Sequence, residues 1–597
     1  MNKSDAADLD GAIDALRGAV AAGGLGFPQV FDLQNNLGVL LVDRFGLQGD
    51  IRDLDEAIAV FGRTIPRLSG HPEQLSMHCT GLGNAWRRRY RHDGQASSLE
   101  QAIAAYRRVV AVAPRSTDPT ERLINLANAL IDRYRLLREV TDLDQTIQAY
   151  EDAVEASPRA YPRLPGLLEA LANAFSDRWE HNGAVADLEA ALETRQEAIA
   201  QTPMNSPDMP GYMSSLGNGY LDRYLYGGDV ADLRESIAWY ERAVKGAPAG
   251  SPELPGWLHN QGIGLRKRYE HTGELNDLNS AIQSESLAVS ATSKDSKDLP
   301  VFLAGWAGAL GERYRRTGDL GDLDGAVAAF RQAVKTPAGS ADRPEFLMGL
   351  GSSLRSRYGN TRHRADLDEA IQRYEEAVDA TPRRSPNRAN RLTGLANALD
   401  DRCDEDDALP DLDKAIGHYR EALVLTPASA PDRPGLSSSL GGSLTNRYER
   451  TGNRNDRRDL DEAIDLFEEA VRAVPESSPH LPSFRNNLAT GLRLRYLLDG
   501  DDKDLTAAVK HYKGACKLGS VSDPRAVLGS ATWWGAWATE RAAWSEAVEA
   551  YGYGLDAAQG LVGLQFSRQE KETWLRLTKG LASGLAYARA MTRDLQG

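Results

Sequence analysis

The sequence has few of the features that mark secreted, metal-binding or membrane proteins. It contains only three cysteines among 597 residues, and Cys79, Cys403 and Cys516 show no paired spacing. They therefore suggest neither a disulfide framework nor a zinc site, and they fit a reducing compartment. No apolar run approaches the roughly 18 residues needed to span a bilayer, and the first residues lack the apolar core of a signal peptide. We expect a soluble, cytoplasmic protein without a membrane partner.

Basic clusters and catalytic motifs are also missing. The formal net charge is −15 and no basic run stands out, which argues against nucleic acid as a partner. The sequence has no glycine-rich phosphate loop with Lys-Ser or Lys-Thr, no His-Glu-x-x-His and no Gly-x-Ser-x-Gly. Cys79 follows His78, but both fall on an expected helix, where a buried thiol is the simpler interpretation. We expect a protein that is not an enzyme and that uses no cofactor or metal.

In place of such motifs, one unit is repeated along nearly the whole chain. Its marker is Asp-Leu-Asp, or a close variant, followed by an apolar helical pattern, and successive markers lie 44 or 45 residues apart with one interval of 48. The marker leucines are Leu9, Leu54, Leu99, Leu143, Leu188, Leu233, Leu278, Leu323, Leu367, Leu412, Leu460 and Leu505. A period this regular indicates a solenoid of stacked helical hairpins, in which each repeat packs only on its neighbours.

Each unit contains the pattern of two helices. In one copy, Leu82 and the small residue Gly83 lie on the first helix, and Ala102 and Tyr106 share a buried stripe of the second. A side chain larger than methyl at the Gly83 position would hold the neighbouring helix away. Pro114 then ends the second helix.

The start of the second helix is predicted from capping chemistry. Asp or Ser before the marker leucine is a good N-cap, and Glu or Gln three residues later completes a capping box. Asp53 with Glu56 and Asp232 with Glu235 fit this pattern. We therefore expect the second helices to begin at the marker aspartates.

The unit resembles a tetratricopeptide repeat over about residues 5–520. Its first leucine, the small residue after it, the second-helix alanine and aromatic, and the final proline match that family's signature. The usual unit has 34 residues, whereas here the two helices lie about seven residues further apart and the link is about four residues longer. The resemblance implies an all-α, right-handed superhelical solenoid of about twelve 45-residue helical hairpins with a C-terminal helical cap.

An arginine recurs immediately before the aromatic residue near the end of the first helix. Members of this row are Arg89, Arg133, Arg178, Arg223, Arg268, Arg313 and Arg357. We interpret the row as a structural ladder, in which each guanidinium pairs with a nearby Asp of the capping element and with helix C-terminal carbonyls. An anion-binding row is the alternative, and the overall acidity of the chain argues against it.

A second row consists of amides and carboxylates on the first helices. The amides stand two residues after the first leucine, and the carboxylates follow four residues later on the same helix face. The row comprises Asn84, Asn128, Asp132, Asn173, Asp177, Asn218, Asp222, Asn397 and Asp401. In the tetratricopeptide family the position of the amides faces the groove and often hydrogen-bonds a bound peptide. The resemblance therefore implies a protein or peptide partner. The neighbouring carboxylates would favour a basic partner.

The alternative is that these side chains only keep a solvated face wet or pair with the ladder arginines. The groove interpretation makes a sharp prediction. Substituting Asn128, Asn173 and Asn218 together by Ala should abolish ligand binding and leave thermal stability nearly unchanged.

The composition changes near residue 521, where Trp533, Trp534, Trp537 and Trp544 crowd together. We divide the chain into a repeat solenoid over residues 1–520 and a degenerate last repeat with Trp-rich capping helices over residues 521–597. Solenoids need such caps to cover the last apolar surface.

This tail also resembles the passage that precedes a CHAT domain, a caspase-like cysteine protease fold, in bacterial repeat proteins. The matching residues are Trp537, Trp544, Glu546, Ala547, Arg568, Lys571, Glu572, Trp574, Leu575, Gly580, Leu581 and Ala582. No residue up to Gly597 matches the protease's His/Cys dyad. The resemblance implies a sensor or regulatory scaffold for a CHAT-type protease in cis or in trans. A standalone assembly scaffold and an enzyme with an unrecognised site are the alternatives, and self-association stays open.

Overall fold

The computed structural model describes residues 3–22, 29–112, 119–158, 161–337, 339–451, 457–522, 524–564 and 580–592. Within these ranges the regular structure is helical and contains no strand, and the helices follow one another as a repeat array. The all-α solenoid of helical hairpins expected from the sequence is thereby confirmed. No helix in the described ranges is both long and apolar enough to cross a membrane.

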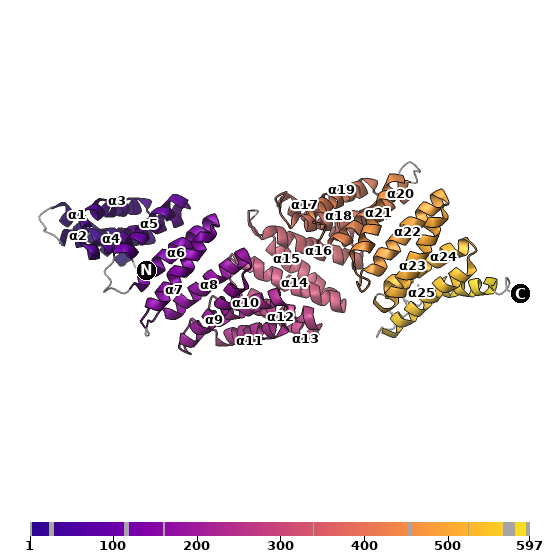
Figure 1. Ribbon diagram of the computed structural model, residues 1–597, viewed down its shortest axis with the longest axis horizontal. Helices are drawn as coiled ribbons and strands as arrows, with labels where there is room; N and C mark the ends of the chain where they lie inside the picture. The colour runs from indigo at the N-terminus through magenta and orange to yellow at the C-terminus, as the bar shows by residue number, and fades with distance from the viewer. Residues whose placement is uncertain are drawn as a thin grey trace. The chain divides into compact units, whose positions relative to one another are not determined.

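The chain forms two compact units, of which unit 1 spans Met1–Ser296. In its described residues, one N-terminal helix precedes six hairpins (Figure 1). Its helices are α1 (Lys3–Ala21), α2 (Gln29–Gln48), α3 (Ile51–Thr64), the 3₁₀ turn η1 (Ile65–Leu68), α4 (Pro72–Asp93), α5 (Ala96–Val112), α6 (Thr120–Leu137), α7 (Val140–Ala156), α8 (Leu164–Asn182), α9 (Val185–Gln201), α10 (Met209–Gly227), α11 (Val230–Gly246), α12 (Leu254–Thr272) and α13 (Leu275–Ala291).

Unit 2 spans Lys297–Gly597, and six further hairpins make up its described part, followed by helical residues 580–592. Its helices are α14 (Leu299–Thr317), α15 (Leu320–Ala333), α16 (Arg343–Thr361), α17 (Arg364–Asp379), α18 (Arg388–Asp406), α19 (Leu409–Leu425), α20 (Arg433–Thr451), α21 (Arg457–Ala473), α22 (Leu481–Asp499), α23 (Asp502–Ser522), α24 (Pro524–Glu540) and α25 (Trp544–Leu564). The boundary expected at residue 520 falls inside α23.

The 45-residue period comes from long helices and short connections. In one representative repeat, α8 has 19 residues and α9 has 17. Only residues 183–184 separate the two helices, and residues 202–208 lead to the next hairpin. The additional residues therefore lie mainly within the helices, and not between them as the sequence comparison predicted.

A left-handed residue ends most first helices and makes the tight connection. Gly94 has φ +67° and Gly228 has φ +75°, and the backbone N–H of Gly228 donates to the carbonyl of Tyr224 at 2.7 Å. Glycine adopts this conformation without steric cost. Arg362 and Asp407 take the same place with φ 56°, where an L-residue costs about 1 kcal/mol.

The second helices begin three residues earlier than the capping-box prediction placed them. Helix α3 starts at Ile51, and its N-cap is Asp50, whose carboxylate accepts from the backbone N–H of Arg52 at 3.0 Å. The marker residue Asp53 lies in the first turn and is buried. The prediction was wrong because the buried carboxylate of Asp53 is held by an arginine of the preceding helix, so it does not cap its own helix.

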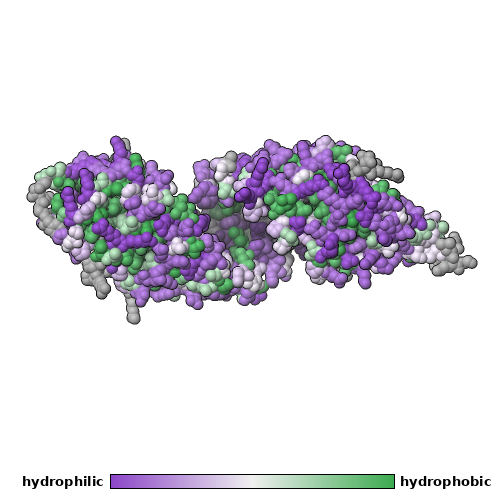
Figure 2. Space-filling model, turned by 45° about the horizontal axis from the view of Figure 1, so that its top comes forward, coloured by the Kyte–Doolittle hydropathy of each residue, from purple (hydrophilic) through white to green (hydrophobic). Residues whose placement is uncertain are grey.

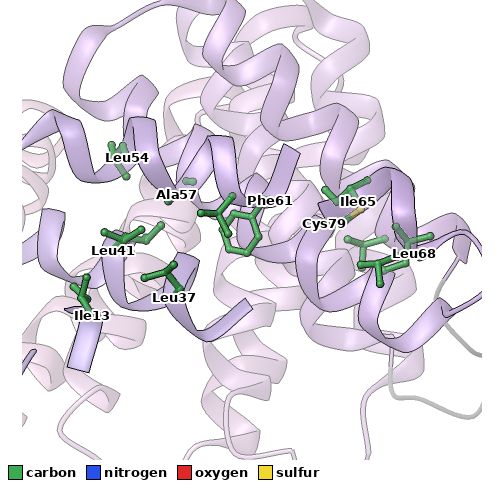
Figure 3. Packing of buried hydrophobic residues seen from close by; sticks show 14 residues of the cluster. Ile13, Leu37, Leu41, Leu54, Ala57, Phe61, Ile65, Leu68 and Cys79 are labelled. Atoms are coloured by element: carbon green, nitrogen blue, oxygen red, sulfur yellow. The ribbon is translucent and has the colours of Figure 1, made fainter. Parts of the chain in front are cut away.

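The core is built where a second-helix aromatic ring packs against small residues of first helices. Figure 3 shows Phe61 of α3 beside Leu37 and Leu41 of α2. In the next hairpin, a Cβ added to Gly83 would lie 2.5 Å from the ring of Tyr106. In this repeat even a methyl group would overlap the ring, whereas the equivalent position of other repeats holds a fully buried alanine, such as Ala127 or Ala396. The visible surface is largely hydrophilic with smaller hydrophobic areas (Figure 2).

Candidate functional site

The arginine row forms bidentate ion pairs within the hairpins. Arg223 of α10 donates from Nε to Asp232 Oδ2 at 2.9 Å and from Nη2 to Asp232 Oδ1 at 2.6 Å. The same two-bond geometry joins Arg133 to Asp142, Arg178 to Asp187, Arg268 to Asp277, Arg313 to Asp322 and Arg357 to Asp366. Each aspartate is the marker residue at the start of the partner helix, so the pair fixes the two helices of a hairpin near their connection.

Several of these arginines also reach the preceding hairpin. Arg178 Nη1 donates to Asp144 of α7 at 2.8 Å, and Arg223 Nη1 donates to Glu189 of α9 at 2.9 Å. One guanidinium therefore links three helices. Arg89 differs, because serine replaces the marker aspartate there, and it pairs with Asp55 of α3 instead.

The amides of the second row are hydrogen-bonded inside their own hairpins. The Oδ1 atoms of Asn84, Asn128, Asn218 and Asn397 accept from Tyr106, Tyr150, Tyr240 and Tyr419 at 2.6, 3.1, 2.7 and 2.6 Å. Asn173 accepts from Arg195, which replaces the aromatic residue, at 3.0 Å. The tyrosine rings are buried, whereas the Asn side chains are exposed or half-buried. Each amide thus satisfies a buried donor with its oxygen.

The sequence carries a signal for this pairing that the prediction missed. Where the second-helix residue is Tyr, the row position holds a hydrogen-bonding side chain; Ser352 contacts the Tyr374 hydroxyl and Thr490 the Tyr512 hydroxyl, at 3.0 and 3.1 Å. The repeats that have phenylalanine instead, at Phe61, Phe330 and Phe467, hold Val39, Gly308 and Gly442 at the row position, and none of these three has a polar side chain. A hydrogen-bonding side chain at the row position therefore accompanies a buried tyrosine hydroxyl.

The carboxylates of the row are mostly neutralised by the chain itself. Asp132 accepts from Arg87 Nε at 2.6 Å, and Asp401 accepts from Arg355 Nε at 2.5 Å. Asp177 lies 4.0 Å from Arg135, and burial raises its pKa. Each of these three arginines lies in the repeat that precedes its aspartate. The sequence analysis did not predict these contacts between repeats.

Asp222 is different, since it has no ion pair within 4 Å in the described residues. Burial raises its pKa to about 6, which the nearby charge of Arg195 partly opposes. Asp222 is therefore the carboxyl group of the row that changes its protonation state near pH 6.

Two repeats place a charge where the others have an aromatic ring. Arg195 is buried and also donates to Ser176 Oγ at 3.0 Å. Glu285 is fully buried and contacts His259 Nδ1 at 2.9 Å, and burial raises its pKa. Polar partners contact both side chains, but Nε and Nη1 of Arg195 are buried without a hydrogen-bond partner among the described residues.

The row residues line two cavities of unit 1. Asn128 and Tyr150 contribute to a cavity of about 470 Å³, together with Glu121 of the same helix as Asn128, Tyr161 of the link before α8 and Tyr212 of α10. Asn84 and Tyr106 contribute to a smaller cavity of about 240 Å³ whose wall includes Arg87, Arg88 and Arg91. The face of the first helices is therefore hollowed at the amide positions.

The Trp-rich segment has mixed roles. Trp534 and Trp537 of α24 are buried, and Trp534 Nε1 donates to Glu546 of α25 at 2.6 Å. Arg541 lies 3.9 Å over the ring of Trp537. Trp533 is the exception, with 66% of its surface exposed. The matched positions Arg568, Lys571, Glu572, Trp574 and Leu575 lie outside the described residues.

Neither a metal-holding cluster nor a reactive Cys79–His78 pair is found among the described residues. They contain no group of three or more His, Cys, Asp or Glu side chains that could hold a metal ion. Cys79 and His78 are both buried; burial raises the pKa of the Cys79 thiol and lowers that of His78. Burial thus disfavours both the thiolate of Cys79 and the imidazolium of His78, so the two residues do not form a reactive dyad.

The comparisons with known proteins concern the repeat. The family model described as tetratricopeptide repeat matches residues 167–199. A structure of a human IFIT1 dimer with m7Gppp-AAAA is similar at 14% identity and TM-score 0.38, covering 87% of this chain and 96% of that one. YrrB, described as a TPR protein with an unusual peptide-binding site, is similar at 16% identity and TM-score 0.26, covering 40% and 94%.

A structure of BtubC from P. vanneervenii is similar at 17% identity and TM-score 0.31, covering 40% of this chain and 94% of that one. No curated protein sequence matches the chain. At these TM-scores the likenesses identify no ligand. The matched repeat and the helical-hairpin architecture together support a tetratricopeptide-type repeat array.

Proposed function

We propose that this chain is a non-catalytic array that binds an extended peptide or protein segment along the face of its first helices. The observation that carries the proposal is the row of accessible amides whose oxygens are tied to buried tyrosines. Asn128 and Asn218 each use Oδ1 for the tyrosine, which leaves the two N–H groups of the amide for other partners. The hydrogen bond also fixes the orientation of the amide, which lowers the entropy cost of binding.

The tyrosine contacts change how this function has to be tested. Replacing Asn128, Asn173 and Asn218 by Ala would strand buried donors, so lost binding would be confounded with lost stability. Serine avoids this problem, because Ser352 contacts the Tyr374 hydroxyl at 3.0 Å at the equivalent position of another repeat. Asn128→Ser and Asn218→Ser together therefore keep a partner for the tyrosines and remove the amide N–H groups.

The experiment is a selection of a displayed random dodecapeptide library on the full chain. We expect the wild-type chain to enrich peptides and the Asn128→Ser/Asn218→Ser variant to bind them at least about tenfold more weakly, with a melting midpoint changed by about 2 °C or less. Asn360→Ser, which alters an exposed asparagine of α16 outside the row, is the control. Equal binding by the double variant, or no enriched peptide at all, would contradict the proposal.

We further propose that the array is the sensor or regulatory part of a CHAT-type protease system and acts in the cytoplasm. The support is the resemblance of residues 537–582 to the passage that precedes such proteases. The three buried free thiols fit a reducing compartment. The test is to read the coding sequence beyond residue 597 and the neighbouring genes. We expect an α/β domain with His and Cys at strand ends, and its absence from both would favour a standalone scaffold.

A further inference from the structure

A cavity of about 340 Å³ in unit 2 has chemistry that neither row explains. It lies on the face of the first helices α20, α22 and α24, with Phe467 and Tyr512 from second helices in its lining. Its walls include Glu449 of α20 and Trp533 of α24. We propose that this cavity holds a lysine or arginine side chain of an extended peptide. The inference rests on the proposed peptide-binding function and names the chemical class of one side chain that the array selects.

Trp533 differs from the neighbouring tryptophans in its exposure to solvent. Its neighbours Trp534 and Trp537 are buried at 0% and 2% exposure, so they serve the packing of α24. Trp533 keeps 66% of its surface exposed, although it lies at a cavity wall. An accessible indole face attracts a cation and is the strongest aromatic partner for Lys or Arg. Exposed tryptophans are also enriched among residues that dominate binding energy.

Glu449 supplies the cavity with an acidic side chain. Its carboxylate is exposed and has no ion pair within 4 Å in the described part of unit 2. The arginines beside it on α20 are already engaged: Arg447 pairs with Asp413 and Asp459, and Arg450 pairs with Asp404. Glu449 is therefore the acidic group of the cavity that remains available to a ligand cation.

The cavity also carries one basic side chain, Arg493 of α22. It is half-buried beside Tyr512. Burial raises the pKa of the Tyr512 hydroxyl, and the positive charge of Arg493 partly opposes that rise. Arg493 thus lies toward the second-helix side of the cavity. Glu449 and Trp533, by contrast, are both exposed on their helices.

The amides of the cavity suit the backbone of the same peptide. Asn486 Nδ2 donates to Asn487 Oδ1 at 3.4 Å, and Asn487 Nδ2 donates to Ser438 Oγ at 3.1 Å. Each NH₂ group has two donors, so one N–H of each amide is left for a backbone carbonyl. The cavity can therefore bind both the main chain and one basic side chain.

The surroundings of the cavity are acidic on the side of α18. The last turns of this helix carry Asp400, Asp401, Asp404, Glu405 and Asp406, and Asp407 follows as its C-cap. Fewer arginines form ion pairs with these groups in the described residues, namely Arg355, Arg364 and Arg450. Asp404 accepts from Asn446 of the cavity wall at 3.0 Å, so the acidic surface continues into the cavity. Its field favours a basic partner and makes association faster at low salt.

The test uses the full chain and peptides enriched from the random dodecapeptide library, labelled with fluorescein for anisotropy. We expect enriched peptides to contain Lys or Arg, and Trp533→Ala to weaken their binding roughly tenfold. Glu449→Gln should weaken it by a similar factor. Both positions are exposed, so these variants keep the fold. Tyr226→Ala, an exposed aromatic of unit 1, and Glu476→Gln, an exposed acid of unit 2, are the matched controls and should leave binding within twofold.

Enriched peptides without basic residues, or binding unaffected by Trp533→Ala and Glu449→Gln, would overturn this inference and leave the proposed function standing. Failure to enrich any peptide would overturn both. A labelled single-stranded dodecanucleotide is measured in parallel. Binding of the oligonucleotide that depends on Trp533, without peptide binding, would assign the indole to base stacking and reject the peptide interpretation.

Discussion

At the scale of single residues, the same asparagine serves packing and presents a binding group. The Tyr240 ring is fully buried, and its hydroxyl donates to Asn218 at 2.7 Å. A buried hydroxyl without a partner costs about 1–3 kcal/mol. In the repeat that has Phe467 in place of this tyrosine, the row position holds Gly442, so the sequence indicates that the ring and the row residue can change together.

Asn218→Ala should therefore lower the stability of unit 1 by about 1–3 kcal/mol, while Asn218→Ala combined with Tyr240→Phe should recover most of that loss. The measurement is a double-mutant cycle of urea unfolding, in which the coupling energy reports the hydrogen bond. Additive effects of the two substitutions would show that the bond contributes nothing to stability.

Asp222 makes a prediction about pH. Burial raises its pKa to about 6 in the folded chain, whereas an unfolded Asp titrates near about 4. Between these values the folded state holds more protons, so the stability contributed by this group is full below about pH 4 and is lost as the pH rises through 6. Asp222→Asn should therefore raise stability at pH 7 by about 2 kcal/mol and flatten its pH dependence between pH 4 and 6.

Thermal melts from pH 4 to 8 measure this effect. The matched variant is Asp132→Asn at the equivalent position of an earlier repeat, where the carboxylate accepts from Arg87 at 2.6 Å. It should lower stability at pH 7, because the guanidinium loses its charged partner. A destabilising effect of Asp222→Asn at pH 7 would contradict the assignment.

The limits of prediction at this scale have a physical cause. The amide row and the arginine row recur at a fixed spacing, so both could be read from the sequence. The pairing of the row arginines with the marker aspartates was predicted as well. The partners of the amides and carboxylates were not, because Asn128 bonds Tyr150 across the hairpin and Arg87 reaches Asp132 in the following repeat. Such contacts depend on how neighbouring helices pack. The correlation between row residue and ring hydroxyl was the signal available in the sequence.

At the scale of helices, the arginine row ties three elements together. Arg223 joins α10 to Asp232 of α11 and to Glu189 of α9. Lysine keeps the charge but loses the planar fork that makes the two-bond pair. Arg223→Lys should therefore increase amide hydrogen exchange in α9, α10 and α11, corresponding to about 1–3 kcal/mol of lost local stability.

The control for this variant is Arg234→Lys, since Arg234 is an exposed arginine of α11. Its exchange profile should match the wild type. Hydrogen-exchange mass spectrometry resolves the three helices from the rest of unit 1. An effect that spreads evenly over the chain, or no effect in α9, would reject the three-helix linkage.

Helix ends also explain what the sequence predicted incorrectly. The marker aspartate has the composition of an N-cap, yet Asp50 caps α3 and Asp53 accepts two bonds from Arg44 at 2.9 and 2.6 Å. Both aspartates satisfy capping rules locally. Only the position of Arg44 on the preceding helix decides between them, and that position follows from the packed hairpin.

At the scale of the whole molecule, the period predicted the architecture well, because each repeat packs on its neighbours and needs no long-range contact. The unbroken repeat gave no sign that the chain divides at Ser296 and Lys297. Residues 1–296 and 297–597 each contain six hairpins in their described parts. Since stability in such arrays is a sum of repeat and nearest-neighbour terms, we expect each fragment to fold when expressed alone.

Circular dichroism and size-exclusion chromatography of the two fragments test this expectation. Each should be helical, monodisperse and cooperatively unfolding. A control fragment of residues 1–273 ends before α13 and deprives α12 of the helix with which it forms a hairpin. It should melt at a lower temperature than residues 1–296, because Leu258 and Leu265 of α12 lose part of the packing that buries them. Aggregation of either complete fragment would mean that the units depend on each other for folding.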